Sequence, residues 1–336
     1  EHPRLMAKIP SVRPRAFLSP AEGFHIFWLD GRLMWMKREV SIGQTIFEKI
    51  TLSTFGRDKA VLEAFIHAAI EARVARELDK IAIYIPNPYT HGDWSRARLG
   101  NNRRLASLVL KAGQTEQILS DLKQFFSDKV RYDDLGIPWR RGYLLYGAPG
   151  TGKTSLVTAL ASEMRLNVCS LSLAASGITD DKIGSLLASV PPRSIILIED
   201  VDAFFRQREQ QSQQVRLSFS GFLNALDGVA AHEGSVVFMT TNHPETLDAA
   251  LVRSGRVDFR MELGPCDHHQ LAGMFRKFHD DPVLAAAFAA ALPEGALAPA
   301  TVQERLLRAR TPAEAFACFE LSVPVALAGK AAADDD

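Results

Sequence analysis

GAPGTGKTS, at residues 147–155, is the stretch that decides the fold. It follows the β-rich run YLLY and opens a helical stretch, which is the context that the pattern GxxxxGK[ST] requires. The glycines let successive backbone N–H groups turn toward an anion, and the helix adds the positive end of its dipole. We therefore predict an ATP site formed by Gly147, Ala148, Pro149, Gly150, Thr151, Gly152, Lys153, Thr154 and Ser155.

Four polar side chains divide the expected chemistry of this site. Lys153 is expected to reach the β and γ phosphates, and the Thr154 hydroxyl to bind Mg²⁺. The apolar run SIILIED at residues 194–200 predicts a strand that delivers two carboxylates to the carboxyl edge of a sheet, where ligands of open α/β sheets bind. We assign Glu199 to the metal and Asp200 to the attacking water.

Polar residues further along the chain complete the predicted site. Asn242 follows the β-rich run at 236–240, and at a strand tip its side chain can hydrogen-bond the attacking water or the γ phosphate. Arg253 and Arg256 lie three residues apart beside a glycine. Near a phosphate loop, such a pair suggests guanidinium groups that enter a neighbouring subunit's site and offset transition-state charge. Ordinary surface charges are the alternative for this pair.

The pattern after residue 142 predicts the fold class. Short β-rich runs at 143–146, 168–173, 195–198, 236–240 and 259–263 alternate with helical stretches. Such alternation predicts an α/β fold, with a doubly wound parallel sheet that helices cover on both faces. The chain after residue 264 is rich in Ala and Leu at helical spacing and predicts a small helical lid, with Val302, Leu306 and Leu307 as examples of the spacing.

The first 104 residues predict a small α+β domain. Residues 24–40 alternate around Asp30-Gly31, a dipeptide that suits a tight hairpin turn, and residues 45–54 predict another strand. Asp58 can cap a helix that runs to about Leu78, and a short apolar run follows at 81–85. The apolar stripe of that helix is Val61, Phe65, Ala68, Ala69 and Ala72. The predicted domains are 1–104, then the P-loop core at 105–264, then the lid and tail at 265–336.

Composition and charge exclude several protein classes. The 336 residues are 47% hydrophobic and 23% charged, which is typical of a globular protein rather than a collagen-like or largely disordered chain. The 39 basic residues balance 39 acidic ones, which weakens the case for a nucleic-acid partner. The basic run RARLGNNRR at 96–104, with Arg140 and Arg141, is either a solvated connector or a positive collar for acidic protein or phosphate.

The cysteines and the longest apolar stretch indicate the cellular environment that the chain is expected to occupy. Cys169, Cys266 and Cys318 fit neither a CxxC metal site nor a disulfide framework, and they favour a reducing compartment. The longest nearly apolar stretch, at 282–292, is about half as long as a membrane-spanning helix. Because the chain begins with Glu1 rather than Met, we expect a fragment that a targeting signal or anchor could precede.

The order of these motifs resembles that of the AAA+ ATPases over residues 105–325. Four stretches, RRGYLLYGAPGTGKTS, SIILIEDVDAFF, FSGFLNALDG and FMTTNHPETLDAALVRSGRVD, are similar to the BCS-one-like branch of that superfamily. The Glu-Asp order at 199–200 belongs to the pattern of that branch. The common order elsewhere in the superfamily is Asp then Glu. The alternative interpretation of the reversed order is therefore that this chain has lost ATP hydrolysis. The module before residue 110 is more loosely similar to the domain that precedes the ATPase in that branch.

The resemblance implies a function, because members of this branch are mitochondrial chaperones. They translocate the folded Rieske iron–sulfur protein for the assembly of respiratory complex III. The chain is thus expected to be a Mg²⁺-dependent ATPase that forms a ring-shaped homo-oligomer, a heptamer, at the mitochondrial inner membrane. The resemblance also implies an anchoring helix upstream of Glu1, a folded protein client such as the Rieske protein, and no nucleic-acid partner.

Two candidate pore segments fit a folded client. Unfolding AAA+ motors grip extended chains with an aromatic side chain in the loop after the second strand, and residues 174–179 (AASGIT) contain none. The second segment, RQREQQSQQVR at 206–216, is polar and rich in Gln, and a floppy surface loop is its alternative. A ring without aromatic grips favours concerted opening around a folded domain over threading.

Two other functions stay open at this point. One is a nucleic-acid-remodelling AAA+ ATPase, which Arg96, Arg98, Arg103 and Arg104 could serve, although neutral charge and a sparsely basic pore disfavour it. The other is a nucleotide-gated scaffold that cycles too slowly to act as a motor. A protease is disfavoured because the sequence holds no HExxH motif.

Overall fold

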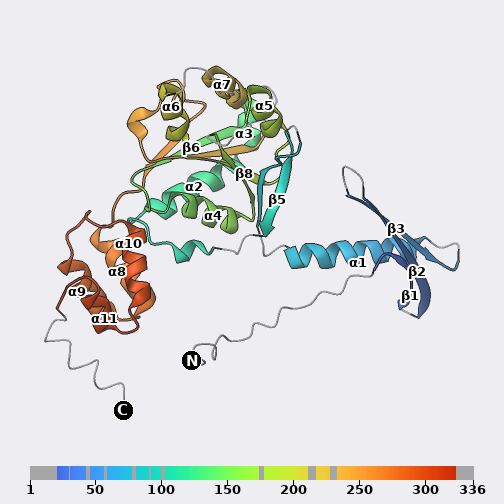
Figure 1. Cartoon of the computed structure of the whole chain (residues 1–336), viewed down its shortest axis with the longest axis horizontal. Coiled ribbons are helices and arrows are strands. Elements are labelled where there is room, and N and C mark those ends of the chain that lie inside the picture. The colour runs from blue at the N-terminus through green and yellow to red at the C-terminus, as the bar shows by residue number, and fades with distance from the viewer. Residues whose placement is uncertain are drawn as a thin grey trace, which may run out of the picture. The chain divides into compact units, whose positions relative to one another are not determined.

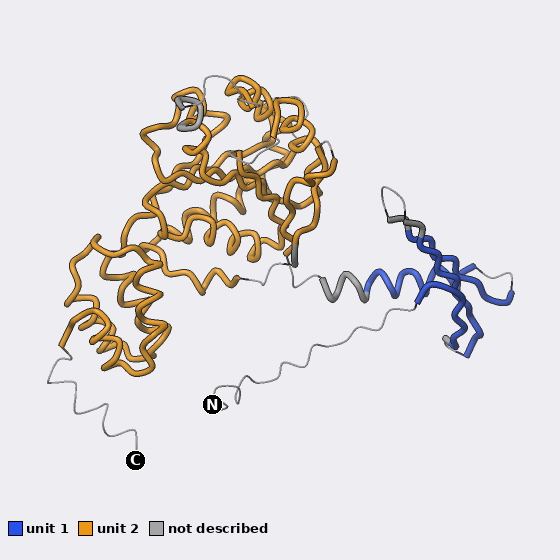
Figure 2. The backbone as a smooth tube through the Cα atoms, in the orientation of Figure 1, with its two compact units in different colours: residues 1–76 blue, residues 77–336 orange. Residues whose placement is uncertain are grey.

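The chain divides into two compact units, Glu1–Arg76 and Glu77–Asp336 (Figure 2). A computed structural model describes residues 21–29, 31–42, 46–56, 59–77, 81–90, 92–99, 103–173, 178–210, 217–227 and 233–322. Within these ranges, no helix combines the length and the apolar character that crossing a bilayer requires.

Unit 1 is a three-stranded antiparallel sheet with one helix. Strands β1 (Gly23–Leu29), β2 (Arg32–Ile42) and β3 (Ile46–Thr54) pair in that order, which confirms the predicted hairpin and third strand. Helix α1 (Ala60–Glu77) packs on the sheet through Phe65, whose ring lies 6.1 Å from that of Phe27. The predicted stripe is too long, because Ala68 and Ala69 are exposed. The expected cap, Asp58, lies outside the described residues.

Unit 2 is built on a seven-stranded sheet with the order β10-β6-β9-β8-β7-β4-β5. All neighbouring pairs from β10 to β4 are parallel, and β5 is antiparallel to β4, so the predicted parallel α/β sheet is confirmed. The strands are β4 (Ala82–Pro86), β5 (Trp94–Leu99), β6 (Arg140–Tyr146), β7 (Asn167–Ser172), β8 (Ser194–Glu199), β9 (Ser235–Thr241) and β10 (Phe259–Glu262).

Strands β4 and β5 belong to the sheet of unit 2, whereas the sequence analysis placed them in the first module. β4 pairs with β7 in parallel, with Ile83 opposite Val168, and the Ala82 N–H donates to Asn167 Oδ1 at 3.1 Å. The boundary between compact units therefore falls after residue 76 rather than after residue 104. The physical reason is that the short apolar run at 81–85 satisfies its backbone groups against β7.

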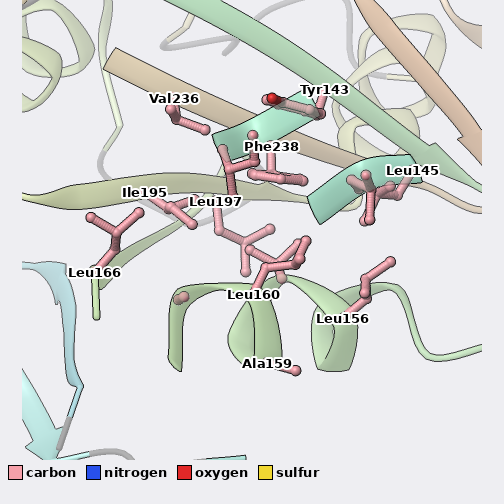
Figure 3. Packing of buried hydrophobic residues seen from close by; sticks show 14 of the residues in the cluster. Tyr143, Leu145, Leu156, Ala159, Leu160, Leu166, Ile195, Leu197, Val236 and Phe238 are labelled. Atoms are coloured by element: carbon pink, nitrogen blue, oxygen red, sulfur yellow. The ribbon is translucent and has the colours of Figure 1, made fainter. Parts of the chain in front are cut away.

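Helices cover both faces of this sheet, as the doubly wound prediction requires (Figure 1). Along β8, Ile195 and Leu197 pack on one face, and Ile196 and Ile198 on the other. The first face carries α4 (Lys153–Met164), whose Leu156 lies in the same core, as Figure 3 shows, and also α2 (Gln114–Ser127). The second face carries α5 (Asp180–Ala188), α6 (Val201–Gln210) and α7 (Phe219–Asp227).

Four helices form the predicted lid at one end of unit 2 (Figure 1). They are α8 (His268–Phe278), α9 (Pro282–Ala291), α10 (Pro299–Arg308) and α11 (Pro312–Ala317), and they enclose a separate hydrophobic core. Val302 and Leu306 are fully buried in this core, as predicted. Leu307, the third example of the spacing, lies within α10 but is 71% exposed. A helical turn of 3.6 residues explains this, because Leu307 points about 100° away from Leu306.

Short elements connect these layers. The 3₁₀ turn η1 (Leu105–Ser107) precedes α2, and α3 (Lys129–Leu135) comes directly after α2. A second 3₁₀ turn, η2 (Pro244–Thr246), follows β9. The three cysteines are free, in agreement with the absence of a predicted disulfide framework.

Candidate functional site

The loop between β6 and α4 needs its glycines for conformational reasons. Gly147, Gly150 and Gly152 have φ angles of 135°, 77° and 98°, a region that other L-residues rarely adopt. A Cβ atom on Gly147 would lie 2.1 Å from the carbonyl oxygen of Leu263, so only glycine fits there. These glycines therefore allow the loop to adopt the conformation that leads into α4.

The backbone of this loop carries hydrogen-bond donors without a partner at the start of α4. Helix α4 begins at Lys153, and its first intrahelical bond joins the Leu156 N–H to the Gly152 carbonyl at 2.8 Å. In the described part of the chain, the N–H groups of residues 150–155 have no acceptor. Free N–H groups at the positive end of a helix form an anion site, which fits a nucleotide's phosphates.

The Lys153 side chain lies inside the curve of the loop. Its Nζ atom donates to the carbonyls of Gly147 at 2.7 Å and Ala148 at 3.0 Å, and to Asn242 Oδ1 at 2.7 Å. Only 8% of Lys153 is exposed. Burial lowers the pKa of this ammonium, and the negative charges of Asp200 and Asp202 oppose that shift. Neutral carbonyls are weak partners for a buried cation, so phosphate oxygens would be better ones.

Thr154 and Glu199 form an oxygen-rich pair beside the lysine. The Thr154 hydroxyl donates to Glu199 Oε1 at 2.8 Å, and Ser170 on the adjacent strand β7 donates to Glu199 Oε2 at 3.0 Å. No group of three or more His, Cys, Asp or Glu side chains with metal-site geometry occurs among the residues described. A hydroxyl and one carboxylate fit Mg²⁺ that completes its coordination with phosphate and water oxygens.

Asp200 occupies a strained backbone position at the end of β8. Its φ angle is 49°, in the left-handed region, and its N–H donates to Thr240 Oγ1 at 3.2 Å. The Asn242 amide nitrogen donates to Asp200 Oδ1 at 3.2 Å, so the predicted water and sensor residues meet. Asp200 is exposed at the strand tip. A strained, exposed carboxylate held by an amide is positioned to act on a small molecule such as water.

The sequence analysis did not single out Asp202, which is fully buried beneath this site. Its Oδ1 atom accepts hydrogen bonds from the Thr241 hydroxyl at 2.9 Å and from the Asn242 N–H at 3.1 Å. Asp202 therefore fixes the strand tip that carries Asn242. The available signal was a carboxylate two residues after Asp200, among the apolar residues Val201, Ala203, Phe204 and Phe205 that open the helix.

The two candidate arginines occupy different environments. Arg256 donates through Nε to both carboxylate oxygens of Asp227, at 3.1 and 3.0 Å, and through Nη1 to the Ala250 carbonyl at 2.5 Å. Arg253 is exposed, and no hydrogen bond of its side chain occurs within the described residues. Arg256 is thus tied within its own chain, whereas Arg253 is free to reach outward.

Two arginines of the proposed basic collar, Arg140 and Arg141, face carboxylates. Arg141 forms an ion pair with Asp121 at 2.5 Å, and Arg140 lies 3.6 Å from Asp227. Arg103 donates from Nη1 to the Ser155 hydroxyl, at 2.8 Å, on the phosphate-binding helix. Arg140 and Arg141 are thus neutralised within the chain, whereas Arg103 has a neutral partner.

Comparisons with known proteins agree with the fold. The model of the ATPase family associated with various cellular activities (AAA) matches residues 143–265, and the model of the BCS1 N terminal domain matches residues 7–108. The mitochondrial chaperone BCS1 of Danio rerio is 41% identical over 295 residues, which are 83% of this chain and 69% of that protein.

Two further relatives show the breadth of this similarity. The mitochondrial chaperone BCS1 of Homo sapiens is 40% identical over 286 residues, 80% of this chain and 68% of that protein. The AAA-ATPase At2g18193 of Arabidopsis thaliana is 34% identical over 239 residues, 66% of this chain and 48% of that protein. The phosphate loop, the parallel sheet and these similarities together show an ATPase. The chain belongs to the BCS1 family of AAA ATPases.

Proposed function

We propose that this ATPase works as a ring-forming chaperone that moves a folded protein across a membrane. The convergence of Lys153, Thr154, Glu199, Asp200 and Asn242 at one edge of the sheet carries the ATPase part of the proposal, because it brings together groups that can bind phosphate, hold Mg²⁺ and orient a water. The bond that is hydrolysed is the phosphoanhydride bond between the β and γ phosphates of ATP, which would bind together with Mg²⁺.

Each residue has one task in the proposed reaction. The free N–H groups of residues 150–155 hold the phosphates, and Lys153 exchanges its carbonyl partners for the β and γ phosphates. Thr154 and Glu199 hold Mg²⁺. Asp200 orients the attacking water and accepts its proton, and Asn242 holds Asp200 and that water in line.

We propose that Arg253 enters the site of the next copy, and that Arg256 sets the loop from which it projects. The ion pair between Arg256 and Asp227 supports this division of tasks. Mixing Arg253→Ala chains with Lys153→Ala chains tests it, because mixed rings contain interfaces with one intact half from each variant. Restored hydrolysis supports action between subunits. Hydrolysis no faster than the sum of the two variants, in rings shown to be mixed, contradicts it.

The names of the relatives support a location and a chaperone role. Because relatives are named mitochondrial chaperone BCS1, we propose a mitochondrial chaperone. By family resemblance we further propose a heptamer at the inner membrane, held by a segment outside these 336 residues, with the Rieske iron–sulfur protein as client in complex III assembly. The paired arginines, Arg140 and Arg141, add no support for nucleic-acid remodelling.

A folded client follows from the pore sequence. Residues 174–179 contain no aromatic side chain that could hold an extended strand by stacking. The test is transport of a Rieske-like domain, locked by an internal crosslink, by this chain joined to a membrane anchor in vesicles. We expect the locked and the free domain to be transported about equally well. Transport of the free domain together with arrest of the locked one would contradict passage of a folded client.

A further inference from the structure

The segment between β5 and α2 crosses from the phosphate-binding helix to the lid. Arg103 donates to Ser155 Oγ on α4 at 2.8 Å. Further along, the Ser107 carbonyl accepts from Lys277 of α8, and the Val109 carbonyl accepts from Gln270 of α8 at 3.0 Å. Residues 103–109 therefore lie where core and lid meet, beside the start of α4.

Two cations meet in this place without a counterion. The partial burial of Lys277 and the nearby charge of Arg103 lower the pKa of the Lys277 ammonium. Across the described ranges, no carboxylate lies within ion-pair distance of either side chain. Like charges held together cost free energy, and a bound anion would offset that cost.

The position of Ser155 shows which anion would come within reach. Lys153 and Thr154 take the β and γ phosphates in the proposed function, and the loop's N–H groups cradle the α and β phosphates. Ser155 is the next residue of α4, its N–H is free, and its side chain turns about 100° away from Thr154. A phosphate bound at the Ser155 N–H would lie close to the guanidinium that contacts Ser155 Oγ.

We propose that Arg103 binds the α phosphate of the nucleotide, and that Lys277 reinforces this positive site from the lid. This inference rests on the proposed function, since it needs a nucleotide in the loop. Arginine suits the task because its planar fork can donate to Ser155 and to a phosphate oxygen at once. The contact would also link nucleotide occupancy to the segment that leads back toward unit 1.

The test compares ligands that differ only in phosphates, on the whole chain. AMP, ADP and adenosine displace a fluorescent ADP analogue from wild type, Arg103→Gln and Arg104→Gln chains. Arg104 is a matched control, because it is the neighbouring arginine and is exposed. We expect Arg103→Gln to weaken ADP and AMP about tenfold or more, as loss of a charged hydrogen bond does, and to leave adenosine unchanged. Arg104→Gln should bind all three as wild type does.

Several results would overturn the proposal. Equal weakening of AMP and adenosine in Arg103→Gln would show a purely structural role. Unchanged AMP affinity would show that no contact exists. Ser155→Ala, which keeps the guanidinium, should weaken AMP less than about threefold, and a loss equal to that of Arg103→Gln contradicts phosphate contact. If Arg103→Gln does not fold, Arg103→Lys serves instead: it keeps the charge but loses the planar fork, so the affinity for AMP should fall while that for adenosine stays unchanged. A wild-type chain that binds no ADP would instead refute the proposed function.

Discussion

Replacing Arg256 by alanine tests whether this arginine is a structural brace rather than a free finger. In the folded chain, Arg256 donates through Nε to both oxygens of Asp227 and through Nη1 to the Ala250 carbonyl. Its side chain is only 18% exposed. Removing it leaves the Asp227 carboxylate with Arg140, 3.6 Å away, and with the weaker influence of the Arg253 charge.

The expected loss of unfolding free energy follows from these contacts. Hydrogen bonds to charged groups contribute about 1.5–3 kcal/mol when they are well shielded. Because 38% of the Asp227 side chain is exposed and Arg140 stays in place, solvent screening reduces the loss for Arg256→Ala to about 1–2 kcal/mol. Arg253→Ala should change the unfolding free energy by less than about 0.5 kcal/mol, since its side chain is exposed.

Urea unfolding of the nucleotide-free chain at low protein concentration measures both values without a contribution from ring assembly. ATP turnover measured on the same variants should fall for both. A loss of stability for Arg253→Ala as large as that for Arg256→Ala would refute the distinction between the two arginines. Unfolding of Arg256→Ala at the same urea concentration as wild type would also refute this distinction.

Three other predictions follow from the same contacts. Lys153→Ala should lower ATP affinity at least about tenfold, because it removes the cation inside the loop, while Lys123→Ala, at an exposed position of α2, should not; calorimetric titration checks this. Gly147→Ala should destabilise by about 1–3 kcal/mol in urea unfolding, because its Cβ would lie 2.1 Å from the Leu263 carbonyl oxygen, whereas Gly184→Ala, with open space around it, should not. The side-chain hydrogen bond from Arg256 lowers the pKa of Asp227. The stability that the ionised Asp227 contributes is therefore complete above its ordinary pKa of about 3.9, and it is lost as the pH falls through the lowered pKa. Unfolding measured from about pH 6 to about pH 3 should thus show a smaller loss for Asp227→Asn than for wild type.

The sequence predicted the parts of the fold that have strong local patterns. Buried parallel strands such as β8 show as apolar runs, and the glycines of the phosphate loop have a fixed spacing, so both could be located directly. Strand β5 could not, because WSRARL at the sheet's edge has the polar composition of a connector. An edge strand needs only one partner, and that partner is set by tertiary structure.

The candidate site divides in the same way. Glu199 and Asp200 were predictable, since a β-rich run places whatever follows it at the sheet's edge. The sequence could not predict the roles of Asp202 and Arg103 or the partner of Arg256, because these depend on contacts between residues far apart in the chain. The Arg103–Ser155 bond joins residues separated by 52 positions, and the Arg256–Asp227 bond joins residues separated by 29.

The most direct test of the proposed ATPase site is the phosphate released by Asp200→Asn, with ATP binding measured on the same sample. Replacing the carboxylate that orients the water should leave ATP affinity within about threefold of wild type and slow phosphate release about 100-fold or more. Asp134→Asn, on exposed α3, serves as the control and should match wild type in both measurements. Phosphate release at the wild-type rate by Asp200→Asn would contradict the assignment of the water-orienting carboxylate and the mechanism built on it.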